Sequence, residues 1–443
     1  MDRRTFCKTS AGFLAFSMIP GIWHCSRPQT KKRHYEFQPL EGKDFKAPVL
    51  QVTPDDGYYV YTYFDVPPFS PSQRYMAVTK LPFQDHLPEL GVTAEICIID
   101  LEEQTIQTIY ETKTWGFQTG ANVQWGGSDR YVYTNDFIDG RGVAVEIDRE
   151  TGKMRAFERS MYNVSRDGTR AIGFPLELLN VTQQGYGMPS QDLENPPSLP
   201  PGAAEDEGVW QTDLKSGKSN LLYSIADVAK AVPGKPPVPG GTYYFWHSKF
   251  NRQGTRIMQV LRYIAPDYIG GRNPIVMTLD ADGTNIHHTP KNEDNDPIYG
   301  LGGGHPNWTP DGDYIIRKLK LNNGKARFCK IKYDGSEFIV LSKKYKGEGH
   351  PSVDDTNRYL ITDTYQGQDP NKMVTLQLLD MEKDEAIDVC SIPTVPRDSL
   401  KGPIKALRLD GHPVWNRDYT KACIQAVHTG NRQLYVVDLS ELT

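Results

Sequence analysis

Four histidines occupy the same place in a repeated phrase of this 443-residue chain. They begin the stretches "HSKFN" at 247, "HPNWT" at 305, "HPSVD" at 350 and "HPVWN" at 412, each three residues before an aromatic or β-branched residue that a turn follows. Imidazoles that converge on one point suit a divalent transition metal, for which histidine is the commonest ligand. The competing interpretation is that each histidine only caps its strand through a hydrogen bond. The sequence alone leaves both open.

The repeat itself indicates which elements position the histidines. Its first phrase is an apolar residue, a polar turn and an apolar run, as in "YNVSRDGTRAIGF", "PNWTPDGDYIIRKL" and "PVWNRDYTKACIQA", and it occurs seven times. A second phrase of an apolar run ending in an acidic or glycine turn, as in "AEICIIDLEEQ" and "LYVVDLSE", also occurs seven times. Each pair of phrases predicts four antiparallel strands.

Four such strands cannot bury both faces alone, so the repeats predict an all-β fold, a seven-bladed β-propeller of four-stranded antiparallel blades. A pair of β-sandwiches is the alternative, and the equal count of both phrases argues against it. Since the chain ends just after the third strand of the last blade, residues 47–55 ("KAPVLQVTP") are expected to close the ring. Residues 47–443 then form one domain. The proline-rich stretches 190–208 and 229–241 are expected to be long surface loops.

The amino-terminal 25 residues are typical of an export signal, and residues 26–46 of a linker. Arg3, Arg4 and Phe6 precede a short apolar stretch, which resembles a twin-arginine signal; a general secretory signal or a lipid anchor on Cys25 are the alternatives. The protein is therefore expected in the periplasm or at the cell surface, without a transmembrane span and as a monomer. A net charge of −5 gives no indication of nucleic-acid binding, which requires a basic surface.

Buried free thiols are expected for the cysteines outside this signal, because they lie far apart within predicted strands and form no CxxC motif: Cys97, Cys329, Cys390 and Cys423.

In a propeller blade the first strand lines the axis, so the histidines should meet at one mouth of the channel. The same register position in the other blades holds Val66, Asn122 and Met161. Loops on that face supply arginines, which bind carboxylates through two parallel hydrogen bonds, and aromatic side chains, which stack on sugars. This combination suits a sugar that bears a carboxylate, although each residue taken singly could be an ordinary loop residue. The candidates are Trp115, Gln118, Tyr186, Arg262, Tyr263, Arg272 and Tyr365.

The phrases resemble those of the seven-bladed oligogalacturonate lyases, above all over residues 240–443. "HPVWNRDYTKACIQAVHTGNRQLYVVDLS" runs parallel to that family's last blade, and "VLRYIAPDYIGGRNPIVMTLDADGTNIH" is similar to its fourth, with Arg272 on the family's arginine and Arg262 where the family has a histidine. The resemblance implies a divalent metal ion at the propeller axis (Mn, Zn or Ca), held by several of the repeat histidines.

"WGFQTGANVQW", "GYG" at 185–187 and "GHPS" at 349–352 are similar to a second group, propeller lyases and hydrolases that act on L-rhamnosyl-α-1,4-D-glucuronate ends. A resemblance to the lyases of this group implies paired histidines in an early blade, but the second and third blades of this chain have none. A resemblance to its hydrolases implies a histidine near the amino terminus on the opposite face of the propeller, but this chain has no histidine between residues 35 and 85.

We therefore predict a polysaccharide lyase acting on a uronate-containing glycan. His305, His350 and His412 are assigned to the metal, with His247 as a fourth ligand or the catalytic base. Arg262 and Arg272 are assigned to the substrate carboxylate, and Tyr186 or Tyr365 to proton transfer. Two alternatives stay open: a glycoside hydrolase, for which Asp136, Glu177 and Asp363 offer no evident pair, and a propeller that binds glycans without catalysis.

Overall fold

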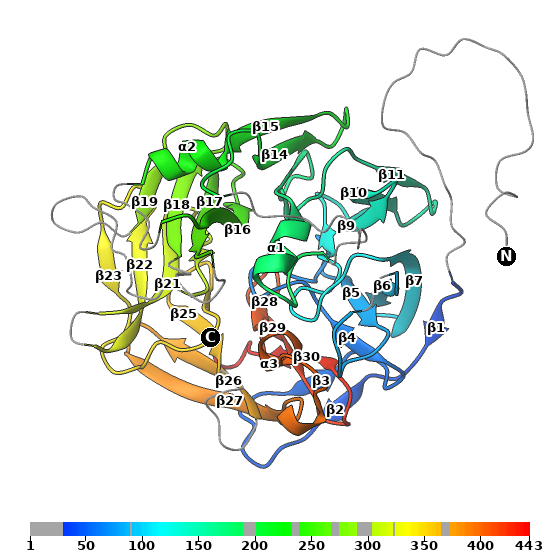
Figure 1. Ribbon diagram of the computed structural model, residues 1–443. Coiled ribbons are helices and arrows are strands. Elements are labelled where there is room, and N and C mark those ends of the chain that lie inside the picture. The colour runs from blue at the N-terminus through cyan, green and yellow to red at the C-terminus, as the bar shows by residue number, and fades with distance from the viewer. Residues whose placement is uncertain are drawn as a thin grey trace, which may run out of the picture.

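The computed structural model describes residues 30–88, 91–188, 201–232, 239–266, 274–289, 304–321, 324–364 and 373–443. Within them the chain forms seven antiparallel sheets arranged in a ring around a common axis (Figure 1). Five sheets have four strands, and the first and last have five. The seven-bladed β-propeller predicted from the repeats is confirmed.

The first four blades follow one another along the chain. Blade one contains β1 (Arg33–His34), β4 (Tyr58–Val60), β5 (Tyr75–Leu81), β6 (Ala94–Asp100) and β7 (Thr105–Thr112). Blade two contains β8 (Gln124–Trp125), β9 (Tyr131–Ile138), β10 (Arg141–Asp148) and β11 (Met154–Ala156). Blade three contains β12 (Asn163–Val164), β13 (Arg170–Gly173), β14 (Gly208–Asp213) and β15 (Ser219–Ser224). Blade four contains β16 (Thr242–Phe250), β17 (Arg256–Ile264), β18 (Ile275–Asp280) and β19 (His287–Thr289).

The last three blades complete the ring. Blade five contains β20 (Asn307–Trp308), β21 (Tyr314–Lys320), β22 (Ala326–Lys332) and β23 (Phe338–Val340). Blade six contains β24 (Ser352–Val353), β25 (Tyr359–Asp363), β26 (Met373–Asp380) and β27 (Glu385–Pro393). Blade seven contains β28 (Val414–Trp415), β29 (Lys421–Ala426) and β30 (Gln433–Asp438), then β3 (Val49–Gln51) and β2 (Gln38–Leu40). Short helices lie in the connections: α1 (Leu176–Thr182), α2 (Ile225–Lys230), η1 (Arg397–Ser399) and α3 (Ile404–Leu407).

The amino-terminal part of the chain closes the ring. Strand β3 pairs with β30 in antiparallel register, Val49 opposite Val437 and Gln51 opposite Tyr435. This confirms that residues 47–55 complete the last blade. Within the predicted linker 26–46, β1 and β2 add outer strands to blades one and seven. Residues 1–29, which include the predicted signal, lie outside the described residues, and among the residues described no helix is long and apolar enough to cross a membrane.

The repeated turn phrase has a physical cause in side-chain caps. Asn251 Oδ1 accepts hydrogen bonds from the backbone N–H groups of Thr255 and Arg256, and Asn416 Oδ1 does the same for Thr420 and Lys421. Such short polar side chains replace backbone partners in a tight turn, which is why Ser, Thr, Asn and Asp recur at this position.

Aromatic side chains of the inner strands fasten neighbouring blades together. The indole Nε1 atoms of Trp125, Trp308 and Trp415 each donate to a backbone carbonyl of the preceding blade, at Pro68 (2.7 Å), Lys249 (3.2 Å) and Ser352 (3.1 Å) respectively. The blades therefore meet through buried aromatic surface, and the indole N–H groups at this surface have hydrogen-bond acceptors.

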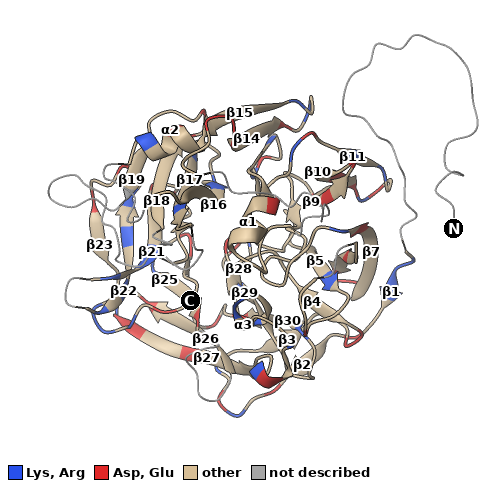
Figure 2. Ribbon diagram, in the orientation of Figure 1, with Lys and Arg blue, Asp and Glu red and all other residues tan. Residues whose placement is uncertain are grey.

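The cysteines outside the predicted signal follow the sequence-based expectation. Cys97, Cys329, Cys390 and Cys423 are free and buried. Figure 2 shows acidic and basic segments interspersed around the ring rather than gathered in one basic face.

Candidate functional site

The four repeat histidines gather at one end of the inner strands. The ring centroids of His305 and His350 are 3.9 Å apart, and those of His350 and His412 are 4.3 Å apart. The ring of Tyr63 lies between this row and His247, at 4.6 Å from His412 and 5.5 Å from His247. The prediction that the shared register brings four imidazoles to the axis is confirmed, as a row of three and a fourth beyond a tyrosine.

Backbone conformation explains part of the residue choice at this register. His247, His305 and His412 have positive φ values of 56°, 60° and 49°, and Asn122 of blade two has 55°. Asparagine and histidine are among the few non-glycine residues that enter this left-handed region readily. In blade six it is the preceding residue, Gly349, that has positive φ. The strand-capping interpretation thus accounts for polar residues here but not for the contacts between their rings.

A buried carboxylate orients the ring of His350 and binds the backbone of His412. Asp363 Oδ1 lies 2.8 Å from His350 Nδ1 and accepts the His350 backbone N–H at 2.8 Å, and Oδ2 accepts the His412 backbone N–H at 3.0 Å. Asp363 has no exposed surface. A Cβ on Gly349 would lie 1.8 Å from the Asp363 carbonyl oxygen, so only glycine fits there. Because Asp363 binds His350 Nδ1, it directs Nε2 of that ring into the site, as carboxylates commonly do for metal-binding histidines.

Nearby polar groups also orient the rings of His305 and His247. His305 Nδ1 lies 2.8 Å from the carbonyl oxygen of Gly349, a second common orienting contact for a ligand histidine. His247 Nδ1 lies 2.5 Å from the hydroxyl of Tyr162.

One group of side chains has the composition of a metal site. Ligand atoms of His350, Asp410 and His412 all lie within 4.8 Å of one another, and all three residues are buried. His412 Nε2 and Asp410 Oδ1 are buried and have no hydrogen-bond partner among the residues that the structure describes, an arrangement that is costly unless another group binds there. Two imidazole nitrogens and a carboxylate oxygen suit a divalent transition metal, so the residues present fit such an ion.

This group differs from the predicted ligand set. It contains His350 and His412 but neither His305 nor His247, whose assignment to the metal stays a prediction. Asp410 was not predicted, although the sequence "LDGHPVW" places it two residues before His412. Its Oδ2 accepts a 2.8 Å hydrogen bond from Arg408 Nε, which orients the carboxylate.

The electrostatic environment favours the uncharged form of three of the histidine rings. Burial lowers the pKa of His247, His305 and His412 well below the usual value, and neighbouring cationic or imidazole groups lower it further. Neutral imidazole is the form that binds metal, so the site does not need to lose protons from these rings near neutral pH.

Blade one fills the axis with aromatic side chains instead of a histidine. Tyr63 and Phe64 are buried, and the Phe64 ring lies 5.2 Å from His350 and 5.9 Å from His305. The hydroxyl of Tyr61 donates to the backbone carbonyl of His412. The repeat alignment missed these residues because the segment 61–66 departs from the phrase.

Three predicted catalytic residues lie around one tryptophan beside this row. The ring of Trp246 contacts His247 at 4.7 Å and Tyr186 at 4.4 Å, and the Arg262 guanidinium lies over it at 5.0 Å. Arg262 Nη1 donates to Gln183 Oε1 at 2.7 Å, whereas its buried Nε has no partner among the described residues. His247, Arg262 and Tyr186 are thus brought together.

Three other predicted residues, Trp115, Gln118 and Tyr263, are buried in contacts with the protein's own backbone. Trp115 is 1% exposed and donates to the Val92 carbonyl, and the Gln118 amide donates to the carbonyls of Ala406 and Arg408. The buried Tyr263 hydroxyl accepts the Gly241 N–H. Their burial disfavours sugar contact, and their substrate-binding role stays a prediction. Arg272 and Tyr365 lie outside the described residues.

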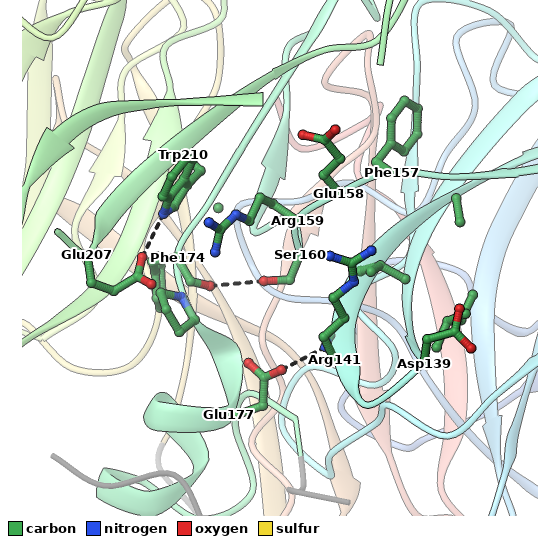
Figure 3. Close-up of a pocket in the computed structure, with 16 residues that line it drawn as sticks. Asp139, Arg141, Phe157, Glu158, Arg159, Ser160, Phe174, Glu177, Glu207 and Trp210 are labelled. Carbon is green, nitrogen blue, oxygen red and sulfur yellow. Dashed lines mark hydrogen bonds between the residues drawn. The ribbon is translucent and has the colours of Figure 1, made fainter. Parts of the chain in front are cut away.

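A cavity of about 590 Å³ opens between blades two and three, away from the histidines. Figure 3 shows Glu177 and Glu207 on its wall with Trp210, whose ring carries the Arg159 guanidinium at 3.7 Å. Glu177 Oε1 accepts the Gly142 N–H at 2.9 Å, and burial, with a smaller contribution from the charge of Glu207, raises the pKa of Glu177. The sequence had singled out Glu177 without a partner; the fold supplies Glu207.

Comparison with solved structures identifies the same architecture elsewhere. An oligogalacturonate lyase in complex with manganese superposes with a TM-score of 0.64 at 15% identity, covering 92% of this chain and 97% of that one. The oligogalacturonate lyase of Vibrio parahaemolyticus gives 0.62 at 14% identity, covering 92% and 98%. The fold is shared with oligogalacturonate lyases. No protein-family model and no curated protein matches the chain. At this identity the likeness establishes the propeller, and the activity has to be argued from the site.

Proposed function

We propose that this protein is a metal-assisted lyase that cleaves a uronate-containing oligosaccharide or polysaccharide by β-elimination. The observation that carries the proposal is the buried group of His350, Asp410 and His412, with two ligand atoms left without partners, at the axis of a fold shared with oligogalacturonate lyases.

The reaction requires three things of the protein: a base, a proton donor and a group that neutralises the substrate carboxylate. The C5–H bond of the uronate breaks as a base takes the proton, a C4–C5 double bond forms, and the C4–O bond breaks as its oxygen receives a proton. The carboxylate must also be neutralised, because its charge opposes formation of the carbanion at C5. A divalent metal bound by His350, Asp410 and His412 would supply a Lewis acid for this neutralisation.

The neighbouring side chains match the other roles. Arg262 can engage the carboxylate through its unpartnered Nε and its terminal nitrogens. His247 is buried, and burial lowers its pKa, so it is unprotonated and able to accept a proton. Proton transfer to Nε2 requires that Nδ1 donate its hydrogen to the Tyr162 oxygen. Burial raises the pKa of Tyr186, so its hydroxyl keeps the proton that the leaving oxygen needs.

The test is to incubate the purified protein with oligogalacturonates and with glucuronate-rich glycans and to follow the ultraviolet absorbance of the unsaturated uronate product. We expect product with one of these substrates, loss of activity after chelation, and loss in His412→Ala. His34→Ala, a change of an exposed histidine on β1, should leave the rate unchanged. No absorbance on any uronate substrate with the metal-loaded protein would refute the lyase and leave glycan binding without catalysis.

A glycoside hydrolase is the second candidate, and the cavity with Glu177 and Glu207 favours it. A carboxyl with a raised pKa beside a second carboxylate has the character of an acid and base pair. Release of reducing ends without ultraviolet absorbance, abolished in Glu177→Gln and retained in His412→Ala, would support the hydrolase over the lyase.

A further inference from the structure

The other mouth of the axis, at the far end of the inner strands from the histidines, holds a second small cavity. It has a volume of about 200 Å³, and all seven blades contribute to its lining. Trp125, Trp308 and Trp415 lie on its wall, and so does the buried ion pair of Lys249 with Asp65. This volume is below the range of cavities that hold drug-sized ligands and suits a small molecule or ion.

Three arginines converge at this mouth because of the repeat. In blades three, four and seven the residue directly after the capping residue of the turn is an arginine: Arg166, Arg252 and Arg417 respectively. All three line the cavity. Burial lowers the pKa of Arg417 to about 10, with further contributions from the charges of Arg166 and Arg252. Burial and the charge of Arg252 lower the pKa of Arg166. Because all three residues line one small cavity, the positive charges of Arg166 and Arg252 act on Arg417, and that of Arg252 acts on Arg166.

Protein groups satisfy few of their donors. Arg252 Nη1 donates to the Tyr419 hydroxyl at 3.2 Å, and Arg417 Nε donates to the Phe69 carbonyl at 3.2 Å. Among the described residues none of the three arginines forms an ion pair or hydrogen bond with a carboxylate, although a guanidinium offers five N–H donors.

Two nearby acidic groups are engaged elsewhere. Asp129 lies close enough to raise the pKa of Arg417, but its carboxylate accepts the hydroxyl and backbone N–H of Ser72. Asp65 is paired with Lys249. Asp355, which holds the arginine position in blade six, acts on Tyr419 at a distance and has no hydrogen bond to the three guanidinium groups.

We propose that this mouth of the propeller binds a small oxyanion, held between the guanidinium groups of Arg166, Arg252 and Arg417. A carboxylate, sulfate or phosphate group accepts paired N–H bonds from arginine and removes the repulsion among the three charges. The oxyanion comes either from a free inorganic ion or from an acidic sugar whose ring fills the cavity. The site is separate from the histidines, so it does not depend on the lyase proposal.

Isothermal titration calorimetry on the purified protein in chloride buffer tests the proposal, with sodium phosphate, sodium sulfate and sodium glucuronate as probes. We expect binding of at least one probe that weakens as ionic strength rises. Arg417→Gln should weaken it by roughly tenfold or more, and the triple change of Arg166, Arg252 and Arg417 to glutamine should abolish it. Arg397→Gln removes an exposed arginine on the opposite face and serves as the matched control.

The outcomes separate the possibilities. Preference for glucuronate identifies an acidic sugar as the ligand, and preference for phosphate or sulfate identifies a free ion. Absence of binding for all three probes at millimolar concentration overturns the proposal, as does undiminished binding in a triple variant that melts like the parent protein. If the triple variant does not fold, Arg166→Gln alone decides, because Arg166 is only partly buried and part of it faces solvent, so glutamine at this position leaves no closed cavity. Lyase activity should be the same in all these variants, so failure of one proposal leaves the other testable.

Discussion

Replacing Asp363 with asparagine is expected to weaken metal binding while the propeller stays folded. The carboxylate accepts three hydrogen bonds, from His350 Nδ1, from the His350 N–H and from the His412 N–H, at 2.8, 2.8 and 3.0 Å. An amide has one oxygen in place of two. If that oxygen keeps its contacts with His350, the amide nitrogen faces the His412 N–H, and two donors then meet.

The magnitude follows from these contacts. Leaving the buried His412 N–H without an acceptor costs about 1–3 kcal/mol of folding free energy. The loss of negative charge also weakens the contact that orients His350. Changes to such supporting groups lower metal affinity about 10–100-fold, which corresponds to about 1.4–2.8 kcal/mol.

The assay is calorimetric titration of chelator-treated protein with Mn²⁺, paired with urea denaturation. Asp354→Asn is the matched control: it makes the same chemical change in the same blade, at the opposite end of the strand pair. Asp354 Oδ1 accepts the N–H groups of Arg358 and Tyr359 in the role that asparagine plays at residues 251 and 416. It should therefore leave metal affinity unchanged. Equal affinity in parent and Asp363→Asn, or an equal loss in both variants, would show that Asp363 does not support a metal site.

Three further predictions concern the scaffold. Lys249→Met should destabilise the protein by about 3–5 kcal/mol in urea denaturation, because it leaves the buried Asp65 charge unpaired, and adding Asp65→Leu should restore most of the loss; a double variant no more stable than the single one would contradict this. The hydrogen bond with Arg358 is the main cause that lowers the pKa of Asp380 from 3.8 to about 2. The ionised Asp380 therefore contributes to stability above about pH 3.8, and this contribution is lost as the pH falls through about 2. In acid unfolding Arg358→Gln should show a smaller loss over that window, and an unchanged profile would count against the pair. A chain that begins at residue 53 lacks the two outer strands of blade seven and exposes the edge of β30, so it should melt at lower temperature and associate in size-exclusion chromatography; unchanged melting and elution would refute a closing role for β3.

The sequence predicted most of the fold, because a propeller is built from local repeats. The capping residue at the turn, the aromatic residue before it and the apolar runs on either side each act within one blade or between adjacent blades. Ser, Thr, Asn or Asp at the turn satisfies backbone N–H groups a few residues away, and Trp125, Trp308 and Trp415 reach only the preceding blade. The same regularity showed that His247, His305, His350 and His412 share one structural position and therefore meet at the axis.

Only the tertiary structure decided what surrounds those histidines. Asp363 ends β25 and Asp410 lies in the connection before β28, and no spacing in the chain shows that both reach His350 and His412. Tyr63 and Phe64 enter the axis from a segment that departs from the repeat, and they separate His247 from the other three rings. The convergence of Arg166, Arg252 and Arg417 likewise depends on closure of the ring, because blade seven meets blades three and four only across the axis. A repeat fixes each residue's place within its blade, whereas the contacts across the channel depend on how seven blades close around it.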